Sequence, residues 1–294
     1  MNKIIILVLA SDTYPSYRNH LAQKKTWVMH KSENVKVYFY KAGENTGIKN
    51  NDLIVKSGSR ADEIGYKNFE AFDWIIKNED FDFLFRTNTS SFINVKNLHE
   101  YINKSHNHSD LIYDGKIINL KNKKNDTCIK FVSGSGILFS KKTIETLVNN
   151  KDEYDHSLWE DVAIGELLNK KGVFPTNGKR YDIQGNIYKE NIHLNHYHYR
   201  CRIDNHYGYP RFLETWVLSE LDFRIKNSKS YNKRLVQMIF FEICKLFYIQ
   251  MPFWKIYNFF RRLLKTLLPK SFYRYIKNIF ENKIKNFQLY YFKK

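Results

Sequence analysis

Short apolar runs of strand length alternate with segments of helical periodicity over the first half of the chain. The pattern predicts strands over residues 4–10, 35–40 and 81–86, with helices over residues 18–29 and 66–77. Further along, it predicts strands over residues 111–113, 128–132 and 136–139 and helices over residues 142–149 and 161–170. Alternation of this kind is typical of an α/β fold in which helices flank a mainly parallel sheet.

The segment 224–294 has a different composition from the rest of the chain. It holds 17 Lys and Arg but only Glu242 and Glu281, a net charge of +15, whereas residues 1–223 carry only +3 of the chain's total of +18. We therefore predict a body over residues 1–223 and a basic tail over residues 224–294. The boundary falls in the Lys-, Asn- and Ser-rich stretch 222–233.

Aromatic rings and cations are interleaved in the tail, most densely over residues 235–260. A basic amphipathic helix of this kind lies on an anionic membrane surface, with its rings at the acyl boundary and its cations on lipid phosphates. Two alternatives are a helical extension whose aromatic residues pack on the body, and a segment that binds single-stranded nucleic acid. No recognisable nucleic-acid-binding motif accompanies the tail, so we expect a membrane surface as its partner and no nucleic acid.

Composition also limits the class of protein. With 294 residues, 43% hydrophobic and 16% aromatic, the chain can bury a full core, which excludes a disordered or collagen-like protein. The three cysteines form no Cys-x-x-Cys pair, which argues against a disulfide framework and a zinc finger. No apolar stretch is long enough to span a bilayer, and no signal-peptide cleavage pattern follows the first apolar run. We expect a cytoplasmic protein held peripherally on the inner face of the cell membrane.

Five short segments between residues 4 and 202 carry the candidate chemistry. The first predicted strand ends in Ala10-Ser11-Asp12, and the helix after it closes with Lys24-Lys25-Thr26-Trp27. The next helix opens on Tyr66-Lys67-Asn68. The strand at 81–86 leads into Arg86-Thr87-Asn88-Thr89-Ser90-Ser91-Phe92-Ile93-Asn94. The last two segments are Ser133-Gly134-Ser135-Gly136-Ile137-Leu138-Phe139-Ser140 and Trp159-Glu160-Asp161-Val162-Ala163-Ile164-Gly165.

In this order the segments resemble the Fringe and beta-1,3-glycosyltransferase family of GT-A nucleotide-sugar enzymes. The resemblance implies a Rossmann-like GT-A fold with a mixed sheet, and a donor site near the carboxyl ends of its strands, where open α/β sheets bind ligands. In the family a basic residue of the first helix reaches the nucleotide, and Lys24 occupies that position here. Ser11 and Asp12, at the end of the first strand, are further donor-binding candidates. The alternative for Lys24 is a surface lysine on an amphipathic helix.

The segment after the third strand departs from the family pattern. The family's three aspartates, which hold a divalent metal, are replaced by Asn88, Thr89 and Ser90, and neutral oxygens bind Mn²⁺ or Mg²⁺ far more weakly than carboxylates. Either the site is inactive, or it transfers sugar without a metal and neutralises the leaving diphosphate with fixed cations. Because arginine binds a diphosphate bidentately, we favour the metal-free enzyme, with Arg86 and Thr87 in the donor site. The alternative for Arg86 is an exposed ion pair at a strand end.

Two later segments match the family more directly. Gly134 and Gly136 are similar to its Gly-x-Gly motif and would let the backbone pass close to a sugar, although a tight turn is the alternative. Glu160 and Asp161 are similar to its acidic-Asp-Val-x-x-Gly signature, whose second carboxylate is the general base. The resemblance implies that Asp161 deprotonates the acceptor hydroxyl while Glu160 holds the acceptor or supports Asp161. The alternative is that both carboxylates only cap a helix N-terminus.

A run of histidines and arginines closes the region. His196, His198, Arg200 and Arg202 recur at period two and so share one face of a predicted strand. The family places a metal-binding His in a late strand, but without carboxylates at residues 88–90 we interpret this face as a phosphate-facing stripe. A zinc site that includes His193, and a solvated edge strand, are the alternatives.

These observations predict an inverting glycosyltransferase, a hexosyltransferase that moves a sugar from a nucleotide-sugar donor to a glycan. A UDP-sugar is the favoured donor. The tail favours a lipid-linked acceptor, as in the assembly of cell-surface polysaccharide or oligosaccharide. We expect no metal and no other cofactor. The alternative is a catalytically silent GT-A-like protein that binds glycan or membrane.

Overall fold

The structure, a computed structural model, describes residues 2–121, 128–204, 207–227 and 235–250. The chain divides into two compact units, Met1–Met238 and Ile239–Lys294. The first unit contains both sheets and the helices α1 to α6.

An eight-stranded mixed sheet forms the centre of the first unit, with the strand order β3-β4-β2-β1-β5-β8-β7-β9. The strands β1, β2, β4 and β5 run parallel to one another, while β3 and β8 run antiparallel to their neighbours. The strands are β1 Ile4–Leu9, β2 Val35–Gly43, β3 Gly47–Lys49, β4 Asp52–Lys56, β5 Phe83–Asn88, β7 Tyr113–Lys121, β8 Cys128–Ser140 and β9 Thr176–Asn177. The predicted α/β class, with a mainly parallel sheet flanked by helices, is confirmed.

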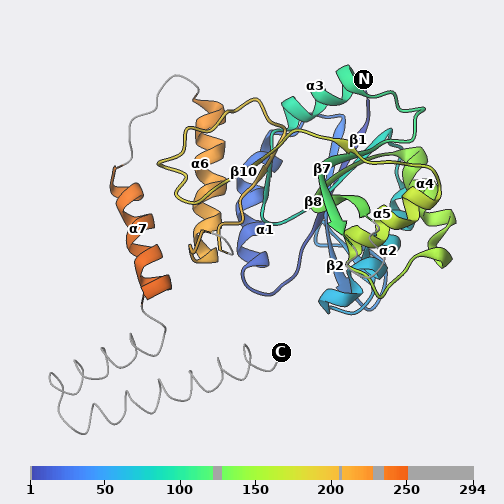
Figure 1. Ribbon diagram of the computed structural model, residues 1–294, viewed down its shortest axis with the longest axis horizontal. Helices are drawn as coiled ribbons and strands as arrows, with labels where there is room; N and C mark the ends of the chain where they lie inside the picture. The colour runs from blue at the N-terminus through green and yellow to red at the C-terminus, as the bar shows by residue number, and fades with distance from the viewer. Residues whose placement is uncertain (1, 122–127, 205–206, 228–234, 251–294) are drawn as a thin grey trace, which may run out of the picture. The chain divides into compact units, whose positions relative to one another are not determined.

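Helices cover both faces of this sheet. Figure 1 shows α1 and α6 on one side of it and α2, α4 and α5 on the other. The helices are α1 Ser16–Lys25, α2 Ile64–Asn78, α3 Val95–Ser105, α4 Lys141–Asn149, α5 Glu160–Lys170 and α6 Glu214–Lys226. Because both faces are covered, the central strand β1 is apolar throughout, and its residues Ile4 to Val8 are buried. This is why apolar runs alone located the central strands.

A second, three-stranded sheet was not predicted. Its order is β10-β11-β6, with β10 Arg180–Asp182, β11 His198–Arg200 and β6 Ser91–Ile93. The pairing of β11 with β6 places Arg200 opposite Ser91, directly after the polar triplet 88–90. The strand predicted over residues 196–202 is shorter than expected, because His196 and Arg202 lie outside β11.

The strands around β8 also differ from the prediction. The expected strands at 128–132 and 136–139 are one continuous strand, β8, which pairs with β7 over residues 128–132 and with β5 over residues 136–140. The expected strand at 111–113 begins at Tyr113 and continues to Lys121, where its exposed residues are paired with the first half of β8. Periodicity missed this extension because one face of the strand carries Lys and Asn.

The predicted start of the tail lies within a body helix. Arg224, the first residue assigned to the tail, is a buried residue of α6. It pairs with Glu220 at 2.9 Å and donates hydrogen bonds to the carbonyls of Ile187 and Glu190. The first unit therefore includes all of α6.

Beyond α6, the structure describes one more helix, α7 Leu235–Gln250. It exposes several large apolar side chains, among them Ile239, Ile243, Leu246 and Tyr248. Among the described residues, no helix is both long and apolar enough to cross a membrane. The remaining part of the predicted tail, residues 228–234 and 251–294, lies outside the described residues.

A polar cluster under α1 links this helix to the strands beside it. His20 is buried, with its ring 3.9 Å from that of Phe39 and its Nε2 3.4 Å from Asp52 Oδ1. Asp52 also pairs with Lys24 at 3.0 Å and with Lys41 at 2.9 Å. Burial lowers the pKa of His20 to about 4, despite the nearby carboxylate, so the ring is neutral at pH 7.

This neutral histidine predicts acid sensitivity. The unfolded chain protonates His20 below about pH 6.5, whereas the folded chain does so only near pH 4. The free energy of unfolding therefore falls by about 3 kcal/mol as the pH falls from 6.5 to 4. His20→Gln should remove this component of the acid loss in urea unfolding followed at pH 7, 5.5 and 4.5, while the exposed control His108→Gln should leave it intact. An unchanged slope in His20→Gln would contradict the assignment.

Candidate active site

The backbone of Gly134 joins two of the predicted site segments. β8 departs from regular pairing with β7 here, since Gly115 opposes Ile137 while Ile117 opposes Val132. In this irregular stretch the Gly134 N–H donates to Asp161 Oδ2 at 2.8 Å, and its carbonyl accepts from Arg86 Nη1. A Cβ at this position would lie 2.6 Å from Glu160 Oε1 and 3.1 Å from Arg86 Nη1. Glycine is therefore required at position 134 because Glu160 and Arg86 approach the backbone closely, and not because the chain turns there.

Arg86 is a buried anchor for Glu160. Its side chain is 1% exposed, and its Nη2 lies 2.8 Å from Glu160 Oε1, while its Nε donates to the Tyr40 hydroxyl at 3.2 Å. Burial lowers the pKa of the guanidinium, but the facing Glu160 carboxylate more than offsets this and raises it above the usual range. Burial also raises the pKa of Glu160, and Arg86 opposes that shift. Arg86 thus faces a carboxylate inside the body, which corrects the alternative of an exposed ion pair at a strand end.

Asp161 has a different environment from its neighbour. It is half-buried at the start of α5, where its Oδ1 accepts from the Val162 N–H at 3.1 Å and its Oδ2 from Gly134. Trp159, two residues before it, is 78% exposed. One carboxylate of the pair is therefore locked to a buried cation, whereas the other is oriented by backbone N–H groups near the surface. Adjacent carboxylates in contrasting environments are suited to separate roles.

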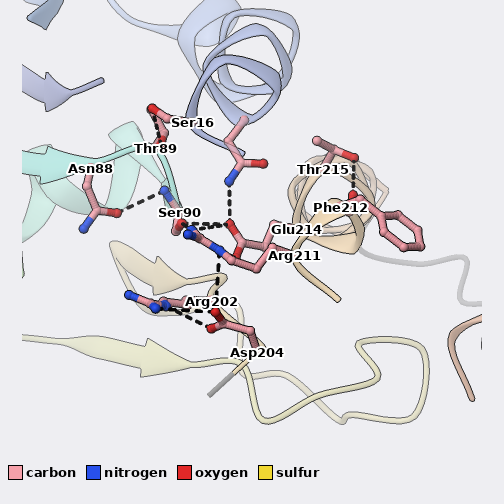
Figure 2. Close-up of polar contacts among 11 residues, drawn as sticks. Ser16, Asn88, Thr89, Ser90, Arg202, Asp204, Arg211, Phe212, Glu214 and Thr215 are labelled. Carbon is pink, nitrogen blue, oxygen red and sulfur yellow. Dashed lines mark hydrogen bonds and ion pairs between the residues drawn. The ribbon is translucent and has the colours of Figure 1, made fainter. Parts of the chain in front are cut away.

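The polar triplet lies at the carboxyl end of β5, where Asn88 is paired with Leu9 at the end of β1. Asn88 Oδ1 accepts from the Ser90 N–H at 3.0 Å, and Thr89 Oγ1 lies 3.2 Å from Ser16 Oγ (Figure 2). Ser16 Oγ also accepts from the Ser11 N–H at 2.9 Å. The structure thus brings Ser11 and the triplet together, at the edge where ligands of open α/β sheets bind.

Two residues that sequence reasoning missed complete this edge. Glu214, fully buried at the start of α6, accepts from Ser90 Oγ at 2.8 Å and from Asn19 Nδ2. Arg211 pairs with Glu214 at 2.7 Å and donates to Ser90 Oγ at 2.9 Å (Figure 2). The only sequence signal was the Arg-x-x-Glu spacing of residues 211–214, which is common on helices.

The donor set at the triplet does not fit a divalent metal. The hydroxyl of Ser90 is already shared between the Glu214 carboxylate and the Arg211 guanidinium, and Asn88 is turned to a backbone N–H. A divalent cation here would meet neutral oxygens and a guanidinium in place of free carboxylates. Among the described residues, no group of three or more His, Cys, Asp and Glu side chains is arranged to hold a metal ion.

The histidines separate in the structure. His198 is 1% exposed, and its Nε2 lies 3.0 Å from Ser91 Oγ, with Gly136 packed against the ring. Burial lowers the pKa of His198 well below its usual value, and Arg180 and Arg200 add to the effect, so the ring is neutral. His196 instead contacts the carbonyl of His193 and the rings of Tyr181 and Tyr199. Thr87, whose hydroxyl donates to the Ser135 carbonyl at 2.6 Å, is likewise part of the buried frame.

Several arginines gather around the small sheet. Arg200 lies opposite Ser91 in the register, and burial lowers the pKa of its guanidinium, with Arg180 contributing. Within the described part of the chain, Arg200 forms no ion pair. Arg180, also missed by sequence reasoning, donates to Ser135 Oγ at 2.7 Å. Arg202 pairs with Asp204 at 2.9 Å.

Lys24 and Asp12 lie in a different group. Both connect to the cluster under α1, Lys24 through Asp52 at 3.0 Å and Asp12 through Lys41 at 2.7 Å. The Asp12 carboxylate is strongly exposed and the Lys24 ammonium is partly so. Among the described residues, no hydrogen bond or ion pair joins either of them to the triplet.

No protein-family model and no curated protein matches the chain. Among solved structures, it is similar to a glycosyltransferase involved in the glycosylation of the major capsid of PBCV-1, with 9% identity and a TM-score of 0.43 over 74% of this chain and 98% of that one. It is also similar to the galactosyltransferase LgtC in complex with donor and acceptor sugar analogs, with 11% identity and a TM-score of 0.42 over 80% of this chain and 99% of that one. The glycosyltransferase GlyE of Streptococcus pneumoniae TIGR4 has 14% identity and a TM-score of 0.40 over 80% of this chain and 66% of that one. At such scores these likenesses assign neither a family nor a reaction.

Proposed function

We propose that the protein is an inverting glycosyltransferase of the GT-A type, with Asp161 as the general base. The observation that carries this proposal is the carboxylate pair at the start of α5. Asp161 is half-buried and oriented by the Gly134 N–H at 2.8 Å, while its neighbour Glu160 is held by buried Arg86 at 2.8 Å. A carboxylate that only caps a helix needs neither a buried guanidinium beside it nor a strand backbone in front of it.

The proposed reaction is a single displacement. The acceptor hydroxyl oxygen attacks the anomeric carbon of the donor sugar, and its proton passes to Asp161. The bond between the anomeric carbon and the phosphate oxygen breaks on the opposite face, and the nucleoside diphosphate leaves with the electron pair. Glu160 keeps the start of α5, and with it Asp161, in place through its pairing with Arg86.

The leaving diphosphate gains negative charge, so cations must face it. We assign this role to Arg200, which lies opposite Ser91 of β6 next to the triplet, and to Arg202, two residues further along the chain. Arg200 supports the assignment because it is half-buried and forms no ion pair among the described residues. Arg86, with its buried position, supports the base instead. The mechanism requires no metal because these guanidinium groups can supply the charge that carboxylate-bound cations supply elsewhere.

We further propose that the donor is a UDP-sugar, that the acceptor is a lipid-linked glycan and that the tail holds the enzyme on the inner face of the cell membrane. The charge of the segment 224–294 supports the membrane contact, as do the exposed apolar side chains of α7. A cell-surface polysaccharide or oligosaccharide is the product class that this location favours.

Asp161→Asn tests the base directly. It should lower kcat by about a hundredfold to ten-thousandfold, because the acceptor hydroxyl loses its proton acceptor. The affinity for the nucleotide sugar should stay within about twofold, since Asn keeps the hydrogen bond from Gly134. Calorimetry and a radiolabelled-sugar transfer assay measure the two quantities. If wild type binds none of a panel of nucleotide sugars, the protein is not a transferase and the catalytically silent alternative stands.

Transfer should persist in excess chelator. With neutral oxygens at residues 88–90, the diphosphate is neutralised by side chains, so about the same kcat is expected in 10 mM EDTA as in 10 mM Mn²⁺. The assay is the rate of sugar transfer under both conditions. Complete loss in EDTA with recovery on adding Mn²⁺ would contradict the metal-free mechanism.

The tail can be tested by ending the chain at Gln250, which keeps every described residue. This removes 11 Lys and Arg but only Glu281, so binding to anionic lipid vesicles should weaken strongly, at about 1 kcal/mol per cation near the surface. Vesicle co-sedimentation measures the binding, with neutral phosphatidylcholine vesicles as the control. Slow hydrolysis of the donor should be unchanged. Aggregation of the shortened chain would instead support a tail that packs on the body.

A further inference from the structure

Arg211 is held at three points beside the triplet. Its Nε lies 2.7 Å from Glu214 Oε1 and 3.8 Å from Asp204 Oδ2, and its Nη2 donates to Ser90 Oγ at 2.9 Å. Figure 2 shows the guanidinium between Ser90 and Asp204. A guanidinium held in this way has lost most of its rotamer freedom before any ligand arrives.

Glu214, the principal partner of Arg211, is held more rigidly than is usual for an ion pair between residues three apart on a helix. Glu214 is 0% exposed, and its Oε2 accepts from Asn19 of α1 and from Ser90 of the triplet as well as from Arg211. With these donors, the hydrogen-bonding capacity of the Glu214 carboxylate is filled. It therefore holds Arg211 in place, and α6 does not have to move. An exposed helix pair would lack all of these restraints.

Part of the guanidinium remains open. The side chain of Arg211 is 28% exposed, and among the described residues no acceptor contacts its Nη1. Arg202 approaches Asp204 from the other side, so two guanidinium groups share that carboxylate (Figure 2). The four arginines of this region, at positions 180, 200, 202 and 211, face three carboxylates, at 182, 204 and 214. The group therefore carries an excess of positive charge.

We propose that Arg211 is a third diphosphate-binding cation, in addition to Arg200 and Arg202, and that it supplies positive charge at the triplet where a carboxylate-bound metal would otherwise be needed. This inference rests on the proposed function and names a donor-site residue that the sequence did not indicate. The N–H groups of Arg211 Nη1 can donate to a phosphate oxygen, while Glu214 holds the other edge of the guanidinium. Ser90, which accepts from Arg211, then orients the cation and does not bind a metal.

The test compares binding of UDP and inorganic pyrophosphate by calorimetry in EDTA, using the full chain. Arg211→Gln should weaken both by about tenfold to a hundredfold, the loss expected for hydrogen bonds to a charged group. Arg211→Lys, which keeps the charge but loses the fork, should lie between wild type and Arg211→Gln. Arg60→Gln, a substitution of an arginine whose side chain is 75% exposed, is the matched control and should bind as wild type does.

A double variant separates ligand binding from a structural role. Arg211→Gln leaves Glu214 buried without its cation and should lower the thermal midpoint. Adding Glu214→Gln removes that unpaired charge, so the midpoint should recover while UDP affinity stays low. If the double variant binds UDP as wild type does, Arg211 only supports the fold and the inference is overturned. The same holds if Arg211→Gln alone binds normally. If wild type itself binds neither UDP nor pyrophosphate, nor any nucleotide sugar, the proposed function fails and this inference fails with it.

Discussion

The arrangement of the candidate site depends on the backbone N–H and carbonyl groups of Gly134. Its N–H orients Asp161 and its carbonyl holds Arg86, which in turn holds Glu160. Both groups belong to one strand that is paired with β5, so the start of α5 is positioned by the sheet and not by a loop. Sites built on strands and helices are held more accurately than sites on loops. No residue with a Cβ fits at this point without moving Glu160 or Arg86.

Two ion pairs, each with a fully buried partner, fix the polar groups around the candidate site. Arg86 with Glu160 joins β5 to α5 on one side of the sheet, and Arg211 with Glu214 ties the start of α6 to α1 and the triplet on the other. Burying such pairs costs desolvation free energy that their attraction only partly returns, so they are poor sources of stability. What they provide is orientation, since the carboxylate and the guanidinium of each pair hold one another in a defined arrangement. That property suits the proposed role, which is to bind a charged leaving group without rearranging.

Hydrophobic periodicity located the central elements because they are buried on both sides. β1, β2 and β5 and the helices α2, α4 and α5 all appear close to their expected positions. The missed elements include the strand β4 and the helices α3 and α6, for which no prediction was made, and several strands that are short or polar. β6 and β10 have three residues each, too few for a period to register, and β8 was divided because its two glycines resemble a turn. Arg224 was assigned to the tail on charge and local composition, although its guanidinium is buried against backbone carbonyls.

The candidate site likewise combines features that the sequence indicates with contacts that only the fold creates. The order of residues is enough to identify two adjacent carboxylates at the start of a helix, neutral oxygens at 88–90, a Gly-x-Gly segment and a tail with a net charge of +15, because these are properties of residue type and spacing. Which cation faces which carboxylate depends on pairs far apart in the chain. Ser90 meets Arg211 across 121 residues and Glu214 across 124, whereas Arg86, the cation nearest to the triplet in sequence, points to Glu160. Only the packing of α6 beside α1 and the pairing of β6 with β11 bring those groups together, since neither contact has a local signal.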